Sequence, residues 1–252
     1  MKHPYPIIDA HTHIEGLPDC EWQDPPELML RLMDEAGIDQ AIVMTYCDAP
    51  LDHPTYNPLD YVHQAVKQYP ERLWAFARLN PGSEQAVSLL EDAVLQRGFK
   101  GLKLHPFGYR IPPDDPCTLK LLQCAARLNV PALFHCGDEE YTLPLQLERA
   151  AKECPDTAII FGHMGGYFHV ADAIAVAKRC SNVYLETSAT PHVHLIREAI
   201  DCLGAERVIY ASDGPGCDPS IEVEKIKLIG LAAADQERVF RANILRLMGM
   251  QG

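Results

Sequence analysis

Short runs of apolar and β-branched residues alternate with longer amphipathic stretches along the whole chain. The apolar runs indicate strands that are buried on both faces, as in a parallel sheet covered by helices. Eight such runs follow one another at an average spacing of about 29 residues, the length of one strand and its crossover helix. Their centres are expected at Ile8, Ile42, Ala75, Leu102, Ala132, Ile160, Tyr184 and Ile209.

The stretches between the runs have helical periodicity and end at residues that stop helices. PPELMLRLMDEAG ends on Gly37, SEQAVSLLEDAVLQRG ends on Gly98, and LPLQLERAAKECP is closed by Pro155. In the last stretch, DQERVFRANILRLMG, Asn243 is expected to interrupt or restart the helix. Eight strand–helix units predict an α/β protein, a (β/α)8 TIM barrel with residues 1–252 in one domain. An open, doubly wound sheet is disfavoured because no glycine-rich phosphate turn follows the first strand.

Composition and charge narrow the class of partner. The 252 residues are 47% hydrophobic and 23% charged, and their formal net charge is −13 without a basic block. This disfavours nucleic acid and anionic membranes as partners and leaves a small-molecule substrate. The first residues lack the apolar run of a signal peptide, so we expect a cytoplasmic protein. The nine scattered cysteines suggest no disulfide framework and no thiolate metal site. A homo-oligomer stays an open alternative.

Five of the eleven histidines fall at the ends of predicted strands, where barrel enzymes keep their active sites. They are His11, His13, His105, His135 and His163, and Asp213 ends the eighth strand. His11 and His13 are two apart on a strand, so their side chains share a face. An isolated histidine at such a place is more often structural, and for His105 that alternative is about as strong as a functional role.

The combination of these residues on several strands is the stronger signal. Three imidazoles and a carboxylate that meet in one concavity form a site of the kind that zinc prefers, although manganese or iron would accept the same ligands. Asp213 is then placed to bind the metal and to move a proton, while His163 stabilises developing charge. The alternative for Asp213 is a turn residue, because Asp-Gly is itself a turn signal.

The motifs DAHTHI, GLKLHP, FHCG, GHMGG, NVYLETS, ASDGP and RANILRLMG together resemble the amidohydrolase superfamily. The resemblance is to its amidohydrolase-2 branch, which includes decarboxylases related to aminocarboxymuconate semialdehyde decarboxylase. It covers essentially the whole chain and implies a metal-dependent TIM barrel. The ligands it implies are His11, His13, His135 and Asp213. His163 would hold or activate a water molecule bound to the metal, or bind a second metal.

Lys103 lies inside an apolar strand, on the same face as His105. In one reading, which resembles the binuclear members of the superfamily, it is carboxylated and bridges two metals. In the other it is an ammonium that binds a substrate carboxylate beside a single metal, and we favour this one. A purely structural ion pair, with Glu186 as its partner, is the third alternative.

The sequence predicts substrate contacts less clearly than metal ligands. We expect four residues to contact the substrate: His105, Arg78, Arg110 and Tyr109. Arginine binds a carboxylate with two hydrogen bonds, which would suit an acidic substrate. Tyr46 and Tyr141 also lie near strand ends, and Glu15 is either over the site or solvated.

The leading interpretation is a metal-dependent hydrolase in which activated water attacks an amide, lactone or ester carbonyl. The alternative is a metal-dependent, non-oxidative decarboxylase of a small aromatic or conjugated acid. A non-catalytic ligand-binding barrel is the third hypothesis.

Overall fold

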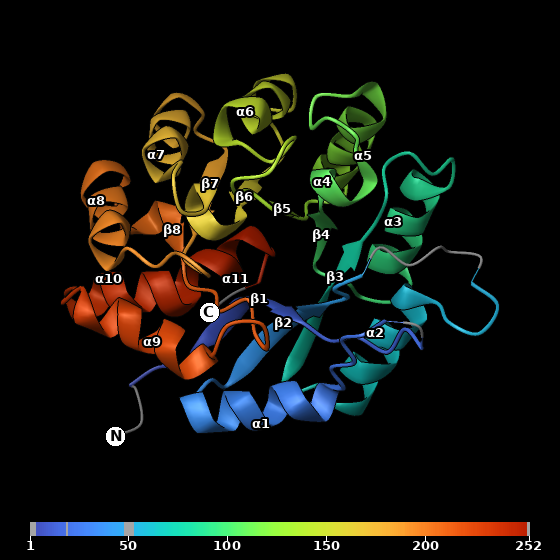
Figure 1. Cartoon of the computed structure of the whole chain (residues 1–252), viewed down its shortest axis with the longest axis horizontal. Coiled ribbons are helices and arrows are strands. Elements are labelled where there is room, and N and C mark those ends of the chain that lie inside the picture. Colours follow the sequence, from blue (N-terminus) through green and yellow to red (C-terminus); the bar gives the residue numbers. More distant parts are fainter. Residues whose placement is uncertain (1–3, 19, 48–52, 251–252) are drawn as a thin grey trace.

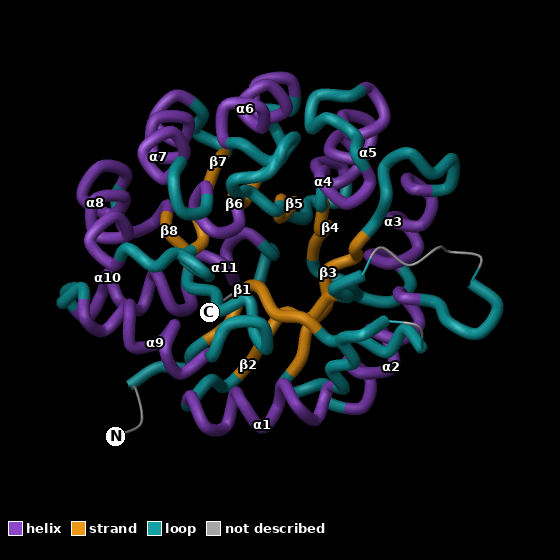
Figure 2. Tube along the Cα trace, in the orientation of Figure 1, coloured by secondary structure: helices purple, strands orange, loops and turns teal. Residues whose placement is uncertain are grey.

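The computed structural model describes residues 4–18, 20–47 and 53–250. Eight parallel strands follow one another in chain order, and a ring of helices surrounds them (Figures 1 and 2). The strands are β1 (Ile8–His13), β2 (Gln40–Met44), β3 (Leu73–Arg78), β4 (Gly101–Leu104), β5 (Ala132–Phe134), β6 (Ile159–Phe161), β7 (Val183–Glu186) and β8 (Val208–Ile209). Every strand contains the centre predicted for it. The fold is therefore the predicted single-domain TIM barrel.

The helices follow the strands as the periodicity indicates. They are α1 (Pro26–Ala36), α2 (Pro58–Gln68), α3 (Ala86–Leu95), α4 (Pro106–Tyr109), α5 (Pro116–Arg127), α6 (Pro144–Glu153), α7 (Val170–Arg179), α8 (Val193–Leu203), α9 (Pro219–Leu228), α10 (Ala233–Glu237) and α11 (Asn243–Leu247). Gly37 ends α1 in the left-handed conformation, with φ of 73°. α3 ends at Leu95, ahead of Gly98. Among the described residues, none of the helices combines the length and the apolar character that crossing a membrane requires.

The barrel closes where β1 meets the segment that follows β8. Thr12 and Gly214 form a parallel bridge, and the backbone N–H of His13 donates to the carbonyl of Gly214 at 2.7 Å. In return, the N–H of Asp213 donates to the carbonyl of His11 at 2.8 Å. Residues some 200 positions apart in sequence are thereby joined by backbone hydrogen bonds at one end of the barrel.

β1 contains an irregularity next to this seam. Asp9 pairs with Ala41 and Thr12 with Val43, so β1 has one residue more than β2 between these pairs. Such a bulge changes which side chains point to one face. Ile8 belongs to the apolar cluster inside the barrel, and His11 nevertheless lines the cavity at its end.

The core has two layers. The larger cluster lies between the strands and the helices, and the smaller fills the barrel with Ile8, Ile42, Phe76, Leu133, Ile160 and Ile209. Ile244 and Leu245 of α11 pack against this inner cluster. Asn243 begins α11 directly after a π-helical turn at Arg238–Ala242. Its buried amide donates to the carbonyls of Ala205 and Val208 at 2.7 and 2.8 Å, which fastens the last helix to the β8 segment.

Candidate active site

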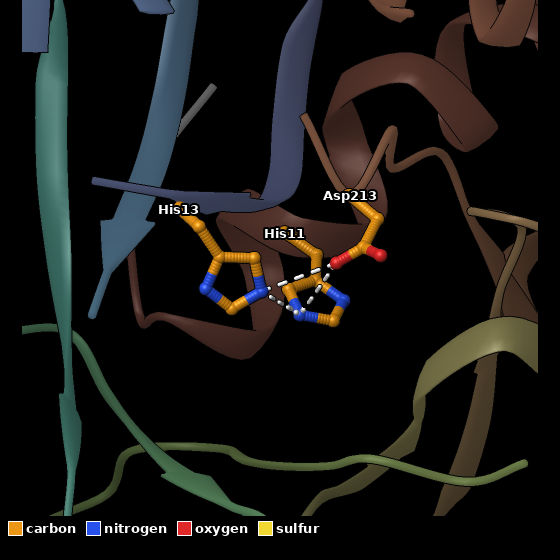
Figure 3. Close-up of side chains that lie close together, drawn as sticks. All are labelled: His11, His13 and Asp213. Carbon is orange, nitrogen blue, oxygen red and sulfur yellow. Dashed lines mark hydrogen bonds and ion pairs between the residues drawn. The ribbon is translucent and has the colours of Figure 1, made fainter. Parts of the chain in front are cut away.

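His11 and His13 of β1 meet Asp213, which follows β8, at the end of the barrel (Figure 3). Nε2 of His13 lies 3.1 Å from Nε2 of His11 and 3.1 Å from Oδ1 of Asp213. Nε2 of His11 is 3.5 Å from the same carboxylate oxygen. The three side chains thus direct one ligand atom each toward a common point.

These separations fit a divalent cation. Ligand atoms about 2.1 Å from a metal lie about 3.4 Å apart in a tetrahedral site and about 3.0 Å apart in an octahedral one. The observed separations fall in and around this interval. The geometry therefore agrees with a divalent metal, and it does not single out zinc.

The hydrogen bonds of the two imidazoles point to the same conclusion. Nδ1 of His11 lies 2.8 Å from Oε1 of Glu186, and Nδ1 of His13 lies 3.2 Å from the carbonyl oxygen of Thr45. Both partners are acceptors, so the network assigns the ring proton of each histidine to Nδ1. Each Nε2 then presents a lone pair toward the other and toward the Asp213 carboxylate. A cation is the natural partner for such a set of acceptors.

Lys103 approaches this set from β4. Its Nζ lies 2.6 Å from Nε2 of His11, and the side chain is buried. In the structure the ammonium of Lys103 donates a hydrogen bond to the lone pair of His11 Nε2. A bound metal would use the same lone pair. The position is the interior one that the sequence predicts, and it agrees with both a substrate-binding ammonium and a metal-bridging carbamate.

Glu186 at the end of β7 organises the buried side of the site. Besides His11, its Oε1 accepts hydrogen bonds from the backbone N–H of His163 at 3.1 Å and the hydroxyl of Ser188 at 2.9 Å. The approach requires glycine at position 162, because a Cβ there would lie 2.7 Å from the carbonyl oxygen of Phe134 and 3.1 Å from Oε1 of Glu186. The sequence indicates Glu186 only as an alternative partner of Lys103. An acidic residue on an otherwise apolar strand was the available signal.

His163 and His135 form the other side of the pocket. Nδ1 of His163 lies 2.8 Å from Oγ of Ser188, and its Nε2 lies 3.1 Å from Nδ1 of His135. Nε2 of His135 is 3.1 Å from Oε2 of Glu139, and this hydrogen bond lowers the pKa of Glu139 to about 2. Among the described residues, the close groups of ligand atoms are His11–His13–Asp213 and His11–His163–Glu186. His135 thus lies in the predicted pocket with a nitrogen directed at His163, and its role as a metal ligand stays a prediction.

The protonation of the cluster suits metal binding. Burial holds the pKa of His11 well below its ordinary value, and nearby Lys103 adds to this. Burial also lowers the pKa of His13. Burial by itself would raise the pKa of Asp213, but the neighbouring imidazoles of His163 and His13 outweigh it and bring the pKa well below its ordinary value. Neutral imidazoles and an ionised carboxylate are the forms that ligate a metal.

Two of these residues have an unusual backbone conformation. His163 and Asp213 both have φ of 61°, in the left-handed region that side chains with a Cβ rarely adopt. This conformation costs roughly 1 to 2 kcal/mol at each residue. Strain of this kind is retained where it positions a functional side chain.

The cluster opens into a cavity of about 320 Å³. Its walls are formed by His11, His13, Tyr46, Cys47, Arg78, Lys103, His105, His135, His163 and Asp213. Nη2 of Arg78 lies 3.0 Å from Nδ1 of His105, so these two predicted substrate contacts are brought together. Two cationic side chains, Arg78 and Lys103, line this pocket.

A second cavity, of about 660 Å³, shares His13, Tyr46 and Asp213 with the first. Trp22 lines it and stacks on Tyr46, with ring centroids 4.8 Å apart. Trp22 gave no signal in the sequence, because its contribution depends on the loop after β1 folding back over the site. The two cavities together form one site with a polar end and an aromatic wall.

The other two predicted substrate contacts lie elsewhere. Tyr109 is the last residue of α4 and packs against the outer hydrophobic core. Arg110 ends α4 in the left-handed conformation, with φ of 54°. The described residues that line the two cavities do not include either side chain. A substrate role for Tyr109 and Arg110 therefore stays a prediction without support from their positions.

The family model described as Amidohydrolase matches residues 8–250. A comparison with curated proteins gave no match. Among solved structures, 2,6-dihydroxybenzoate decarboxylase from Rhizobium is similar with a TM-score of 0.74 and 19% identity over 99% of each chain. The 5-carboxyvanillate decarboxylase of Novosphingobium aromaticivorans, complexed with manganese and 4-hydroxy-3-methoxy-5-nitrobenzoic acid, has a TM-score of 0.78 and 16% identity over 98% of this chain and 97% of its own. An uncharacterised TIM-barrel protein from Bordetella bronchiseptica has a TM-score of 0.80 and 19% identity over 97% and 100%. At these identities the likeness establishes the fold.

Proposed function

The chain belongs to the amidohydrolase family and is an enzyme, and from this premise we propose that it is a metal-dependent, non-oxidative decarboxylase. The proposed substrate is a small aromatic or conjugated carboxylic acid. This was the alternative in the sequence interpretation, and it now takes precedence over hydrolysis. We place the reaction in the cytoplasm, because the spacing of the nine cysteines does not suggest the disulfide framework that is typical of secreted proteins.

The main support for the proposal is the set of side chains that line the two adjoining cavities. Arg78 and Lys103 line the pocket beside the His11–His13–Asp213 group. The adjoining cavity has the stacked rings of Trp22 and Tyr46 as a wall. Cationic side chains recognise a carboxylate, and a flat aromatic wall recognises a planar ring. A planar carboxylic acid would fit both parts of the site, with its carboxylate at the cationic side chains and its ring against the aromatic wall.

The solved structures support the same reaction. Several similar chains are decarboxylases of hydroxylated benzoates, and those from Polaromonas and Novosphingobium contain manganese. We therefore propose manganese or zinc at His11, His13 and Asp213, with one ion per chain and His135 as a further ligand. In that position a divalent cation would polarise the oxygen atoms of the substrate.

The residues of the chain would carry the remaining chemistry. Arg78 and Lys103 hold the substrate carboxylate, and the wall of Trp22 and Tyr46 keeps the ring in plane. Asp213 or His163 delivers a proton to the ring carbon that bears the carboxylate. The carbon–carbon bond then breaks, its electron pair restores the conjugated system, and carbon dioxide leaves. Asp213 is ionised in the resting site, so it must first accept the proton that it delivers.

One contact favours hydrolysis as a second candidate. Nζ of Lys103 lies 2.6 Å from Nε2 of His11, close enough for a carboxylated lysine to share a metal site. In that case the site would hold two metals and activate water for attack on a lactone or amide carbonyl. The two functions share the same metal ligands and differ in the state of Lys103.

A parallel assay separates the candidates. Protein loaded with manganese or zinc is offered hydroxybenzoates and carboxylated lactones, and carbon dioxide release and ring opening are measured together. We expect carbon dioxide without hydrolysis, loss of turnover after chelation, and its return with metal. Ring opening without carbon dioxide would establish the hydrolase instead. Absence of turnover together with a failure to bind metal would favour a ligand-binding barrel.

A further inference from the structure

Two cysteines far apart in sequence meet at the rim of the site. Sγ of Cys20 lies 2.7 Å from Sγ of Cys47, and the residues are 27 positions apart. Cys20 lies in the loop after β1 and Cys47 in the segment after β2. The sequence spacing gave no indication of this pair, because only the folding of two neighbouring loops brings the thiols together.

A buried carboxylate holds both segments in place. Oε1 of Glu15 accepts the backbone N–H groups of Gly16 and Leu17 at 2.9 Å each, on the segment that leads to Cys20. Its Oε2 accepts the N–H groups of Tyr46 and Cys47 at 3.1 and 2.8 Å. One side chain therefore joins the two loops.

Further contacts reinforce this arrangement. Glu15 pairs with Asp24 in an antiparallel bridge, and the N–H of Cys20 donates to the carbonyl of Leu17 at 3.0 Å. The thiols are already adjacent, so linking them would require little additional ordering of the backbone. Both side chains are partly exposed, which gives a small oxidant access to them.

The pair adjoins the walls of both cavities. Cys47 lines the pocket at the metal cluster, and its neighbour Tyr46 lines both cavities. Trp22, two residues after Cys20, stacks on Tyr46. A bond between the sulfurs would therefore join the two segments that carry the aromatic wall.

We propose that Cys20 and Cys47 form a reversible disulfide, a redox modification site at the rim of the active-site cavity. The oxidant is a peroxide or a low-molecular-weight disulfide. With hydrogen peroxide, the Cys20 sulfur attacks one oxygen to give a sulfenic acid and water. The Cys47 sulfur then displaces hydroxide from Cys20, and the hydroxide takes the Cys47 proton and leaves as a second water. The two thiols lose two electrons, and the peroxide gains them.

The order of attack follows from the surroundings of Cys47. Burial, together with Cys20 and the carboxylate of Glu15, raises the pKa of the Cys47 thiol above its ordinary range. Its thiolate is therefore disfavoured, which leaves Cys20 as the sulfur that meets the oxidant first. Cytoplasmic disulfides of this kind are transient and responsive to redox conditions.

Peptide mapping tests the proposal directly. The metal-loaded full chain is reduced, treated with hydrogen peroxide or oxidised glutathione, alkylated and digested with trypsin. Tryptic peptides 3–31 and 32–67 each contain a single cysteine, Cys20 and Cys47. We expect these peptides to be linked, with a loss of about 2 Da from the intact chain that dithiothreitol reverses. The readout does not depend on which reaction the enzyme catalyses.

Two variants provide the controls. Cys20→Ser should abolish the link, whereas Cys202→Ser, which alters an exposed thiol on α8, should leave it intact. Closing a loop of this length should also raise the melting temperature of the oxidised wild type by roughly 5 °C, and of Cys20→Ser not at all. Links to other cysteines, or only sulfinic acids and glutathione adducts at Cys20 and Cys47, would overturn the proposal.

Discussion

Nδ1 of His11 lies 2.8 Å from Oε1 of Glu186, and both side chains are buried completely. The carboxylate belongs to β7 and the imidazole to β1, so the contact crosses the interior of the barrel. It fixes the ring orientation of His11 and leaves Nε2 for the cluster. Carboxylates that hold a ligating histidine in this way tune metal affinity without touching the metal.

Replacement of this carboxylate gives the first prediction. Glu186→Gln keeps one acceptor oxygen but removes the charge, so metal affinity should fall about 10- to 100-fold. Competition with a chromophoric chelator measures the change. Glu148→Gln alters an exposed ion pair with Arg179 and serves as the control. Equal affinities in all three proteins would contradict the role assigned to Glu186.

Asp213→Asn tests the cluster itself. The amide is a weaker ligand and cannot accept a proton, so we expect loss of bound metal and a decrease of at least about 100-fold in kcat/KM. Metal content per chain and turnover are measured on the same sample. Turnover at the wild-type level with metal retained would show that the reaction does not use this carboxylate.

Lys103→Met separates the two readings of the lysine. If Nζ binds the substrate carboxylate, metal content stays near one per chain and KM rises about 10- to 100-fold, because a charge-assisted hydrogen bond is lost. If Lys103 is carboxylated, the variant loses one of two metals instead, and bicarbonate supports metal loading of the wild type. Metal content and KM together distinguish these outcomes, and we expect the first.

Much of the fold follows from the sequence because the signals for it are local. Each strand is an apolar run of its own, and Gly37 stops its helix through its own backbone conformation. The placement of His11 and His13 is equally local, since alternation along a strand requires only two residues. Asp213 was predictable because closure of an eight-stranded barrel must bring its last strand to its first.

The rest of the site depends on contacts between distant segments, and no sequence pattern predicts that these segments meet. Glu186 reaches His11 because glycine at 162 leaves space for it. Trp22 contributes through a loop, and the nitrogen of His135 turns toward His163. Tyr109 and Arg110 looked equivalent to Arg78 in sequence, but the extra helix α4 carries them away from the cavity walls. Side-chain direction in loops is decided by tertiary packing.

Asn243 should be important for stability. Its buried amide donates to the carbonyls of Ala205 and Val208, and Asn243→Ala would leave both without this donor. We expect the free energy of unfolding to fall by about 2 to 4 kcal/mol. Urea titration measures it. A loss below about 0.5 kcal/mol would show that water replaces the amide at no cost.

Glu222 should make stability depend on pH. Its carboxylate lies 2.5 Å from Nζ of Lys225, yet burial raises its pKa from 4.5 to about 7. Between these values the folded protein retains a proton that the unfolded chain has released, so the contribution is fully present below about pH 4.5 and is lost as pH rises through about 7. The loss should be about 3 kcal/mol.

Urea titrations of the wild type and of Glu222→Gln, at roughly pH 5, 6, 7 and 8, measure the effect across this window. Glu222→Gln should lack this downward slope, since the amide does not titrate. Glu224→Gln on the same helix alters an exposed pair with Lys227 and should retain the slope. Parallel pH profiles for wild type and Glu222→Gln would refute the assignment.

The hydrogen bonds that close the barrel come from the same few residues that form the proposed metal site. His11 and His13 stand at the beginning of the barrel and Asp213 at its end, so neither half of the chain can assemble the cluster by itself. During synthesis the proposed ligand set is incomplete until the eighth strand has docked against the first. Cofactor loading would therefore follow folding in this protein, and its presence would mark a chain that has been finished and closed.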